Sequence, residues 1–375
     1  MLVVPLVLIS LILGTASIGD MKSVGRVGGK TLLFYLTTTA IAIGGALLFA
    51  TLFQPGSDLT MKVAAGAAKI KEAPSLQDVI IGLVPSNPFK ALTDGNMLQV
   101  IVFSVIFGLA LASLGKKVEQ LMTVLEQVND VVMRMIMLIM LVAPLGVFAL
   151  VAKVFATEGF SAFVPLLAYV GTVFFVLMFH LFVIYTGALR FIANLSPVIF
   201  FKKFYSTMLF AFSTASSNAT IPVTMETVEY KMGVDRSVAS FTIPFGATVN
   251  MDGTAIMQGV AVAFIAQAYG IHLSFADYML VIMTATLASV GTAGVPGVGL
   301  ITLSMVLQQV HLPVEGIALI MGVDRVLDMT RTAVNITGDT IVTLIVGKSE
   351  KKFDKSVFLD PEAGIVNEES AENVI

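Results

Sequence analysis

The sequence contains no cysteine and no tryptophan, and it has only three histidines among 375 residues. Without cysteine, the chain forms no disulfide bond and offers no thiolate for catalysis or metal binding. His180, His272 and His311 are far apart in the sequence, so we do not expect a metal site built on imidazole ligands. Charged residues make up 13% of the chain, against about 25% in soluble globular domains. This shortage argues against soluble enzymes, nucleic-acid binders and secreted disulfide scaffolds.

Hydrophobic residues, in contrast, make up 57% of the sequence. Apolar runs close to the ~20 residues that span a bilayer recur from end to end. They predict an all-α membrane protein with multiple spanning helices. We expect the end of one helix at 1–18, long helices at 30–53, 119–153 and 162–193, and two or three short helices within 77–115.

Lysine and arginine residues indicate which short loops face the cytoplasm. If the spans alternate, four basic groups fall on one side, and residues 54–76 form an extracellular loop on the other. The positive charge places the first side, with the tail at 348–375, in the cytoplasm. We therefore expect a multi-pass protein of the cell's inner (plasma) membrane with a cytoplasmic C-terminus. The four groups are Lys22, Arg26 and Lys30; Lys116 and Lys117; Arg190, Lys202 and Lys203; and Lys348, Lys351 and Lys352.

Four polar segments interrupt the apolar helices in the second half of the chain. Backbone outside a helix is tolerated at membrane depth only where it is buried in protein or lines a watery cavity. Such segments are typical of re-entrant helical hairpins and broken helices, although each taken alone is compatible with an ordinary loop. We expect two such hairpins and a broken helix. The four segments are 213–220, 250–254, 289–297 and 324–339.

The last of these segments places five polar side chains on one face of a helix. Their spacings of 4, 3, 4 and 4 residues confine them to an arc of about 80° at ~100° per residue. Ionisable residues inside a membrane span indicate a functional site, and the alternative is an amphipathic helix that faces the cytoplasm. The five residues are Asp324, Asp328, Arg331, Asn335 and Asp339.

The chemistry of this face predicts a site for cations and an acidic amino acid. Together with Asp252, the aspartates outnumber the arginine, so the buried set needs bound cations or protons. Carboxylate, amide and backbone oxygens suit a hard cation such as sodium, and we expect no cofactor. Arg331 offers a planar fork for a carboxylate, and Asp328 is placed to receive an ammonium group. A dicarboxylate carrier would need only Arg331, and a neutral amino acid carrier would need only Asp328.

Several motifs give the sequence a family resemblance. They are Asn250-Met-Asp-Gly-Thr254, Gly291-Thr-Ala-Gly-Val-Pro-Gly297, Asp328-Met-Thr-Arg-Thr-Ala-Val-Asn335 with Gly338-Asp339, the serine-rich 213–220 segment and Pro85-Ser-Asn-Pro88. With these motifs the chain resembles the glutamate/aspartate transporter family, the dicarboxylate/amino acid–cation symporters, over nearly all of residues 1–348. Against the family pattern, the sequence is shortened at its N-terminus by a first helix and most of a second.

The resemblance implies inverted repeats and a homotrimer in which each protomer has a scaffold domain and a mobile transport domain. Residues 1–53 would supply helices to both domains, 77–193 would form scaffold and trimerisation helices with one transport-domain helix, and 194–347 would form the transport domain. This domain would carry substrate and sodium across the lipid bilayer in an elevator motion. The implied function is sodium-driven symport of L-aspartate or L-glutamate rather than enzymatic catalysis. A passive channel and an intramembrane hydrolase are the alternatives from other classes.

Carried over position by position, the resemblance assigns residues to a substrate pocket and three sodium sites. The substrate pocket comprises Ser217, Thr254, Val295, Asp328, Arg331, Thr332 and Asn335. The first sodium site comprises Gly246, Asn250, Asn335 and Asp339; the second comprises Thr248, Met251, Ser289, Val290 and Thr292; and the third comprises Tyr35, Thr38 and Thr39 with Asn250 and Asp252. Members that also move protons commonly have a glutamate where this chain has Gln258, so we expect no obligatory proton at that position.

Overall fold

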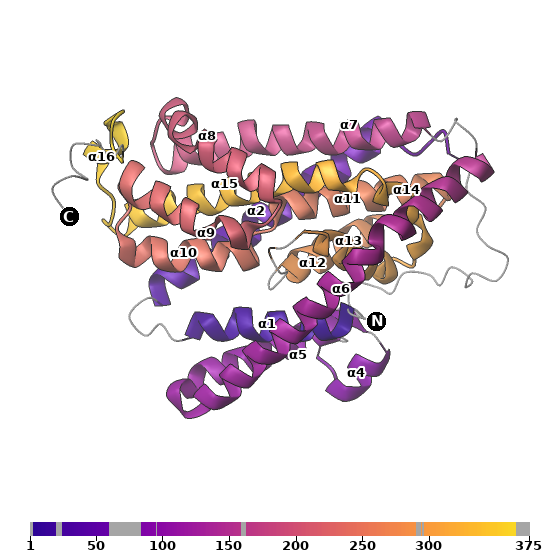
Figure 1. Ribbon diagram of the computed structural model, residues 1–375, viewed down its shortest axis with the longest axis horizontal. Coiled ribbons are helices and arrows are strands. Elements are labelled where there is room, and N and C mark those ends of the chain that lie inside the picture. The colour runs from indigo at the N-terminus through magenta and orange to yellow at the C-terminus, as the bar shows by residue number, and fades with distance from the viewer. Residues whose placement is uncertain are drawn as a thin grey trace.

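The computed structural model describes residues 3–19, 25–59, 84–94, 96–158, 163–289, 294 and 296–364. Within these residues the fold is helical, with no β-strand and one isolated bridge between Val234 and Phe353. The predicted all-α class is therefore confirmed, as Figure 1 shows.

The helices of the first half follow the apolar runs of the sequence. Two of them are longer than the expected 30–53 and 119–153, since the first begins at Gly25 and the second ends at Glu158. The bounds are α1 (Val3–Gly19), α2 (Gly25–Phe53), α4 (Pro88–Asp94), α5 (Met97–Leu114), η1 (Gly115–Val118), α6 (Glu119–Glu158) and α7 (Phe163–Phe179), which continues into the π-helical segments η3 (His180–Tyr185) and η4 (Ala188–Ile192).

The second half consists mostly of shorter helices that the polar segments separate. The exception is the 324–339 segment, which lies inside one continuous helix. The bounds are α8 (Pro197–Thr214), α9 (Ser217–Glu226), η5 (Thr227–Lys231), α10 (Arg236–Val249), α11 (Asp252–Ala268), α12 (Phe275–Ser289), α13 (Val298–Gln309), η6 (Val314–Gly316), α14 (Ile317–Met321), α15 (Asp324–Ser349) and α16 (Lys355–Leu359).

Two of the predicted interruptions are only two residues long. Ala215 adopts a left-handed conformation, with φ of 49°, which ends α8, and the Ser216 side chain then caps α9 by accepting a hydrogen bond from the Ala219 amide at 3.2 Å. Asn250 and Met251 alone separate α10 from α11, so the rest of the 250–254 motif is already helical. The expected unwound turn is therefore shorter than the motif.

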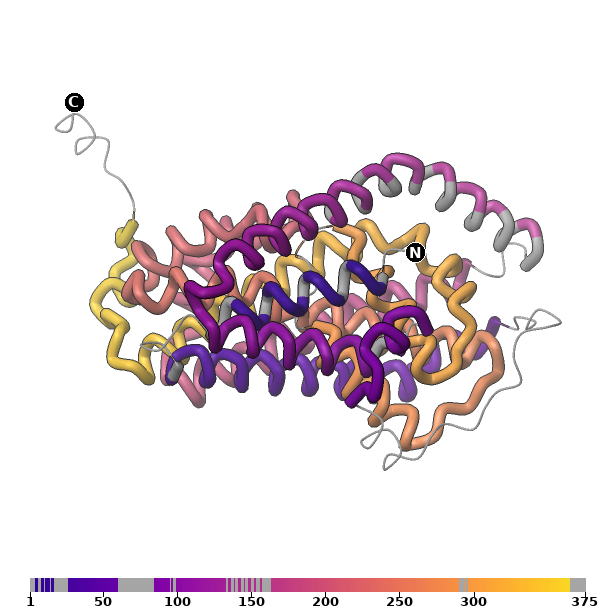
Figure 2. The backbone as a smooth tube through the Cα atoms, turned by 90° about the horizontal axis from the view of Figure 1, so that it is seen from below, coloured from indigo at the N-terminus to yellow at the C-terminus, as the bar shows by residue number. Residues whose placement is uncertain are grey.

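Helix α11 lies at the centre of the molecule. The stretch 236–268 contains α10 and α11, and its apolar window is completely buried, whereas the windows of the other three apolar stretches are 28–39% buried. Helices α2, α7, α12 and α15 pack around α11, while α1 packs chiefly against α5 and α6. Figure 2, seen from below, has α1, α5 and α6 in front of the central helices.

Four segments of the described chain are long and apolar enough to cross a membrane. They cover residues 26–53, 99–132, 163–192 and 236–268. Large apolar side chains on the outside, such as Leu48, Leu145 and Phe191, are more than half exposed and suit contact with lipid rather than water. The chain is therefore a multi-pass membrane protein, and the re-entrant course of α8–α9 and α12–α13 stays a prediction.

Basic residues from three of the four predicted cytoplasmic groups meet at one end of the helices. Arg26 and Lys30 of α2 both pair with Glu350 at 2.6 Å, and Lys348 donates to the Ala193 carbonyl. Lys203 of α8 donates to the carbonyls of residues 231 and 357 at 2.6 and 2.7 Å. The hydrogen bonds from Lys30 and Arg26 hold the pKa of Glu350 below its ordinary value. These contacts place the three groups on the same side, as the charge pattern predicts.

Candidate substrate and cation site

A small cavity lies where the α8–α9 turn, the α10–α11 break, the α12–α13 connection and α15 meet. Five of the predicted substrate residues line it, whereas Val295 lies outside the described residues. The lining also includes Met251 from the break between α10 and α11. The full lining is Ala215, Ser217, Met251, Thr254, Gly294, Val298, Gly299, Asp328, Thr332 and Asn335.

The α8–α9 turn and the α12–α13 connection touch each other beside this cavity. The Ser216 hydroxyl donates to the Gly294 carbonyl at 2.7 Å, and the Asn218 amide donates to the same oxygen at 3.1 Å. A Cβ atom on Gly294 would lie 2.8 Å from both the Ala247 carbonyl oxygen and the Asn218 side-chain oxygen. The contact between the two turns therefore requires glycine at this position.

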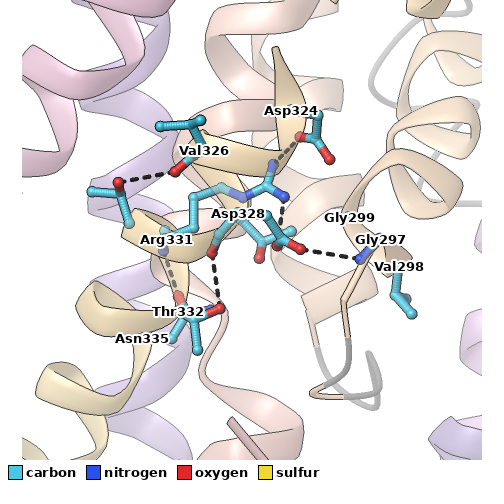
Figure 3. A network of polar contacts seen from close by, with 12 residues as sticks. Gly297, Val298, Gly299, Asp324, Val326, Asp328, Arg331, Thr332 and Asn335 are labelled. Atoms are coloured by element: carbon cyan, nitrogen blue, oxygen red, sulfur yellow. Dashed lines mark hydrogen bonds and ion pairs between the residues drawn. The ribbon is translucent and has the colours of Figure 1, made fainter. Parts of the chain in front are cut away.

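Arg331 does not line the cavity; it is fully buried on α15 and lies next to the lining residue Asp328. Its guanidinium donates through Nη1 to Asp324 at 2.9 Å and through Nη2 to Asp328 at 2.7 Å. Figure 3 shows the guanidinium between these two carboxylates, which come from the same helix face. The polar face predicted from the spacing is thus buried, and the alternative of a helix face exposed to the cytoplasm is not observed.

Asp328 links α15 to the α12–α13 connection. Its Oδ2 accepts a hydrogen bond from the Gly297 amide at 3.1 Å, at the N-terminus of α13. A helix N-terminus favours a carboxylate because its free amides and the helix dipole are both positive. The packing is close here, since a Cβ on Gly299 would lie 3.3 Å from Nη2 of Arg331. The Gly297 contact was not predictable from the sequence, because only Asp328 carries a charge.

The residues of the first predicted sodium site lie together between α10 and α15. The Asn250 amide donates to the Asp339 carboxylate at 2.8 Å and to the Asn335 carbonyl at 3.1 Å. A Cβ on Gly246 would lie 2.5 Å from Oδ1 of Asp339, so the glycine leaves the carboxylate room to approach. Oδ1 of Asn250 is buried and has no hydrogen-bond partner within the described residues. A buried acceptor without a donor is what a bound cation would satisfy.

The second predicted sodium site is described only in part, because Val290 and Thr292 lie outside the described residues. The Met251 sulfur accepts a hydrogen bond from the Asn335 amide at 3.4 Å. Thr248 and Ser289 each donate to a carbonyl of their own helix, at 3.0 and 2.7 Å. These hydrogen bonds do not connect Thr248 with Ser289.

The third predicted sodium site is centred on Asp252, which is fully buried. The Thr39 hydroxyl of α2 donates to its Oδ1 at 2.5 Å. The Tyr35 hydroxyl donates instead to the Thr242 carbonyl at 2.9 Å, and Thr38 donates to the Tyr35 carbonyl at 3.1 Å.

Asp252 also contacts two residues that no sequence motif assigns to a site. Oδ2 of Asp252 accepts a hydrogen bond from the Tyr185 hydroxyl at 2.7 Å and lies 3.2 Å from Nε2 of His180. Both residues lie in η3, within the apolar stretch 163–192, where two isolated polar side chains form no recognisable spacing pattern. The only available signal was that His180 is a histidine inside a membrane span.

Comparisons with known proteins agree on one family. The model of the sodium:dicarboxylate symporter family matches residues 1–349. A proton/glutamate-aspartate symporter of Escherichia coli (strain K12) is 37% identical over 366 residues, which cover 95% of this chain and 83% of that protein. A proton/sodium-glutamate symport protein of Geobacillus stearothermophilus is 36% identical and covers 95% and 86%, respectively. A C4-dicarboxylate transport protein of Rhizobium leguminosarum is 35% identical and covers 94% and 81%.

Proposed function

The chain belongs to the sodium:dicarboxylate symporter family, and from this premise we propose that it is a sodium-coupled symporter of L-aspartate or L-glutamate. Membership of this family makes it a transporter of dicarboxylates or amino acids, and not an enzyme. The choice of an acidic amino acid and of sodium is the proposal. It rests on the charges and donors that α15 brings to the cavity.

The observation that carries the proposal is the buried guanidinium of Arg331 between two carboxylates. An acidic amino acid presents two carboxylates and one ammonium group. Its side-chain carboxylate would exchange with Asp324 or Asp328 for the fork of Arg331, and its ammonium would pair with the released Asp328. A C4-dicarboxylate would use Arg331 but leave Asp328 without an ammonium partner. Only an acidic amino acid would therefore pair with both Arg331 and Asp328.

The surplus of negative charge supports coupling to a cation. Asp252, Asp324, Asp328 and Asp339 are buried in the same region, together with the single positive charge of Arg331. An anionic substrate would increase the imbalance in a place of low dielectric constant. Cations that bind with the substrate offset this cost, and the buried oxygen of Asn250, which lacks a hydrogen-bond partner within the described part of the chain, is one ligand for them. Gln258, which donates to Thr302 at 2.8 Å, cannot ionise and therefore offers no proton-carrying group at that position.

The proposal extends to the assembly and to the motion of the protein. We propose a homotrimer in which α1, α5 and α6 belong to the scaffold, while α2, α7 and α8–α15 form the transport domain. The separate packing of α1 against α5 and α6 supports this division. The transport domain would move across the membrane as an elevator, with the C-terminal tail in the cytoplasm.

Uptake of radiolabelled aspartate into proteoliposomes tests the proposal. We expect concentrative uptake with an inward sodium gradient, and little uptake when lithium or a proton gradient alone replaces it. Unlabelled glutamate should compete for uptake, whereas succinate and serine should compete weakly. Uptake that a proton gradient drives equally well without sodium would contradict sodium coupling, and strong competition by succinate alone would indicate a C4-dicarboxylate carrier.

Contact between the α8–α9 turn and the α12–α13 connection should be needed for tight substrate binding. In Gly294→Ala the new methyl group would collide with Ala247 and Asn218, and such overpacking costs ~1–3 kcal/mol. We expect the KM for aspartate uptake to rise about tenfold or more. Gly171→Ala on α7 is the matched control, because a Cβ there meets nothing within 4 Å. Equal KM values for the two variants would show that this contact is not needed for tight substrate binding.

A further inference from the structure

The carboxylate of Asp252 is held from two sides by three side chains. Its Oδ1 accepts a hydrogen bond from Thr39 of α2 at 2.5 Å, and its Oδ2 faces Tyr185 at 2.7 Å and His180 at 3.2 Å. Since an ionised carboxylate can only accept, Nε2 of His180 is the donor in this contact. Two donors from one helical segment therefore occupy Oδ2, and among the described residues only the Thr39 hydroxyl donates to Oδ1.

The π-helical conformation of η3 makes this double contact possible. His180 and Tyr185 are five residues apart and form the two ends of η3. In an α-helix, five residues correspond to a rotation of about 140° past a full turn, so the two side chains would point in different directions. A π-helix bonds residue i to residue i+5, which places such residues one above the other. The two rings are in edge-to-face contact, with centroids 4.5 Å apart.

Helix α15 leaves room for the Tyr185 hydroxyl at this point. A Cβ atom on Gly338 would lie 2.1 Å from this oxygen and 2.6 Å from Nδ2 of Asn250. Glycine at 338 therefore allows the hydroxyl to reach Asp252 between α11 and α15. The neighbouring residue on α15 is Asp339, which binds Asn250. The π-helical segment thus reaches the place where the first and third predicted sodium sites adjoin.

We propose that His180 and Tyr185 are positioning residues for the coupling cation, because they fix the Asp252 carboxylate through Oδ2, so that Oδ1, which accepts one hydrogen bond from Thr39, keeps a second lone pair for the ion. The proposal rests on the sodium coupling proposed above. Close by in the sequence, Oδ1 of Asn250 is a further buried oxygen, which has no hydrogen-bond partner within the described residues. Groups that hydrogen-bond a metal-ligating carboxylate typically change metal affinity 10- to 100-fold when they are removed. Substitutions at these positions should therefore change the affinity for the ion and not the affinity for the substrate.

The test is the sodium concentration that gives half-maximal aspartate uptake into proteoliposomes. We expect this concentration to rise about tenfold in Tyr185→Phe and in His180→Leu, whereas the KM for aspartate at saturating sodium stays within about twofold of the original. His180→Gln retains an amide donor and should recover part of the loss. Tyr169→Phe is the matched control, since this buried hydroxyl on α7 has no hydrogen-bond partner within the described residues. Its half-maximal sodium concentration should not change.

A second measurement covers variants that transport too slowly for an uptake assay. The sodium concentration that half-maximally raises the thermal midpoint of the purified protein reports ion binding directly. Unchanged half-maximal sodium concentrations in Tyr185→Phe and His180→Leu would overturn the inference. A decrease of the uptake rate by the same factor at every sodium concentration would also overturn it. If the original protein shows no sodium dependence at all, the proposed coupling itself fails. The two failures are therefore distinguishable.

Discussion

Replacement of Arg331 by cysteine should abolish aspartate uptake. The guanidinium binds Asp324 at 2.9 Å and Asp328 at 2.7 Å, and its side chain is buried. In the variant the substrate carboxylate has no partner, and loss of one side of a buried charge pair costs about 2–5 kcal/mol or more. We therefore expect a decrease of more than about 30-fold in aspartate uptake at low substrate concentration, measured in proteoliposomes with a sodium gradient.

The same variant should distinguish loss of selectivity from loss of folding. Asp328 keeps its role as a partner for ammonium, so we expect the cysteine variant to take up a neutral amino acid such as serine. Arg325→Cys, one turn away from Asp328 on an exposed position of α15, is the matched control and should retain aspartate uptake. Aspartate uptake by Arg331→Cys at the original rate would show that the substrate pocket is assigned to the wrong residues.

Replacement of Asp339 by asparagine should weaken sodium binding and raise the sodium concentration that uptake requires. Asp339 is buried, and its Oδ1 accepts a hydrogen bond from Asn250 at 2.8 Å. The new side chain is nearly the same size but carries no negative charge, so the cation loses its charged ligand in a region of low dielectric constant. We expect aspartate uptake at an ordinary sodium concentration to decrease by at least about tenfold, since buried charged partners contribute ~2–5 kcal/mol.

A matched control for this variant is Asp277→Asn. Asp277 is also buried, but it accepts hydrogen bonds from Ser274 at the start of α12, at 2.7 Å. An asparagine oxygen can accept the same bonds, so the half-maximal sodium concentration should stay unchanged in the control. If Asp339→Asn retains the original half-maximal sodium concentration, the first predicted sodium site does not include this carboxylate.

The fold class and much of the site were predictable from the sequence because both have a local, periodic signal. Runs of apolar residues predicted the spanning helices, and the polar break at Asn250 separated α10 from α11 as expected. The spacing of charged residues placed Asp324, Asp328 and Arg331 on one face of α15, where the structure brings them into contact. Residues 3, 4 or 7 apart on a helix are neighbours whatever surrounds them.

The contacts between distant segments had no such signal. His180 and Tyr185 lie in an apolar run more than sixty residues before Asp252, and an α-helical period would have placed them on different faces. Only the π-helical segment and the packing of α7 on α11 bring both side chains to one carboxylate oxygen. The contact of Gly297 with Asp328 likewise depends on where the α12–α13 pair lies against α15. The sequence by itself determined which helices form and which of their faces are polar. The tertiary structure alone decided which polar atoms meet, because such contacts depend on the relative positions of whole helices and not on the spacing of residues within one.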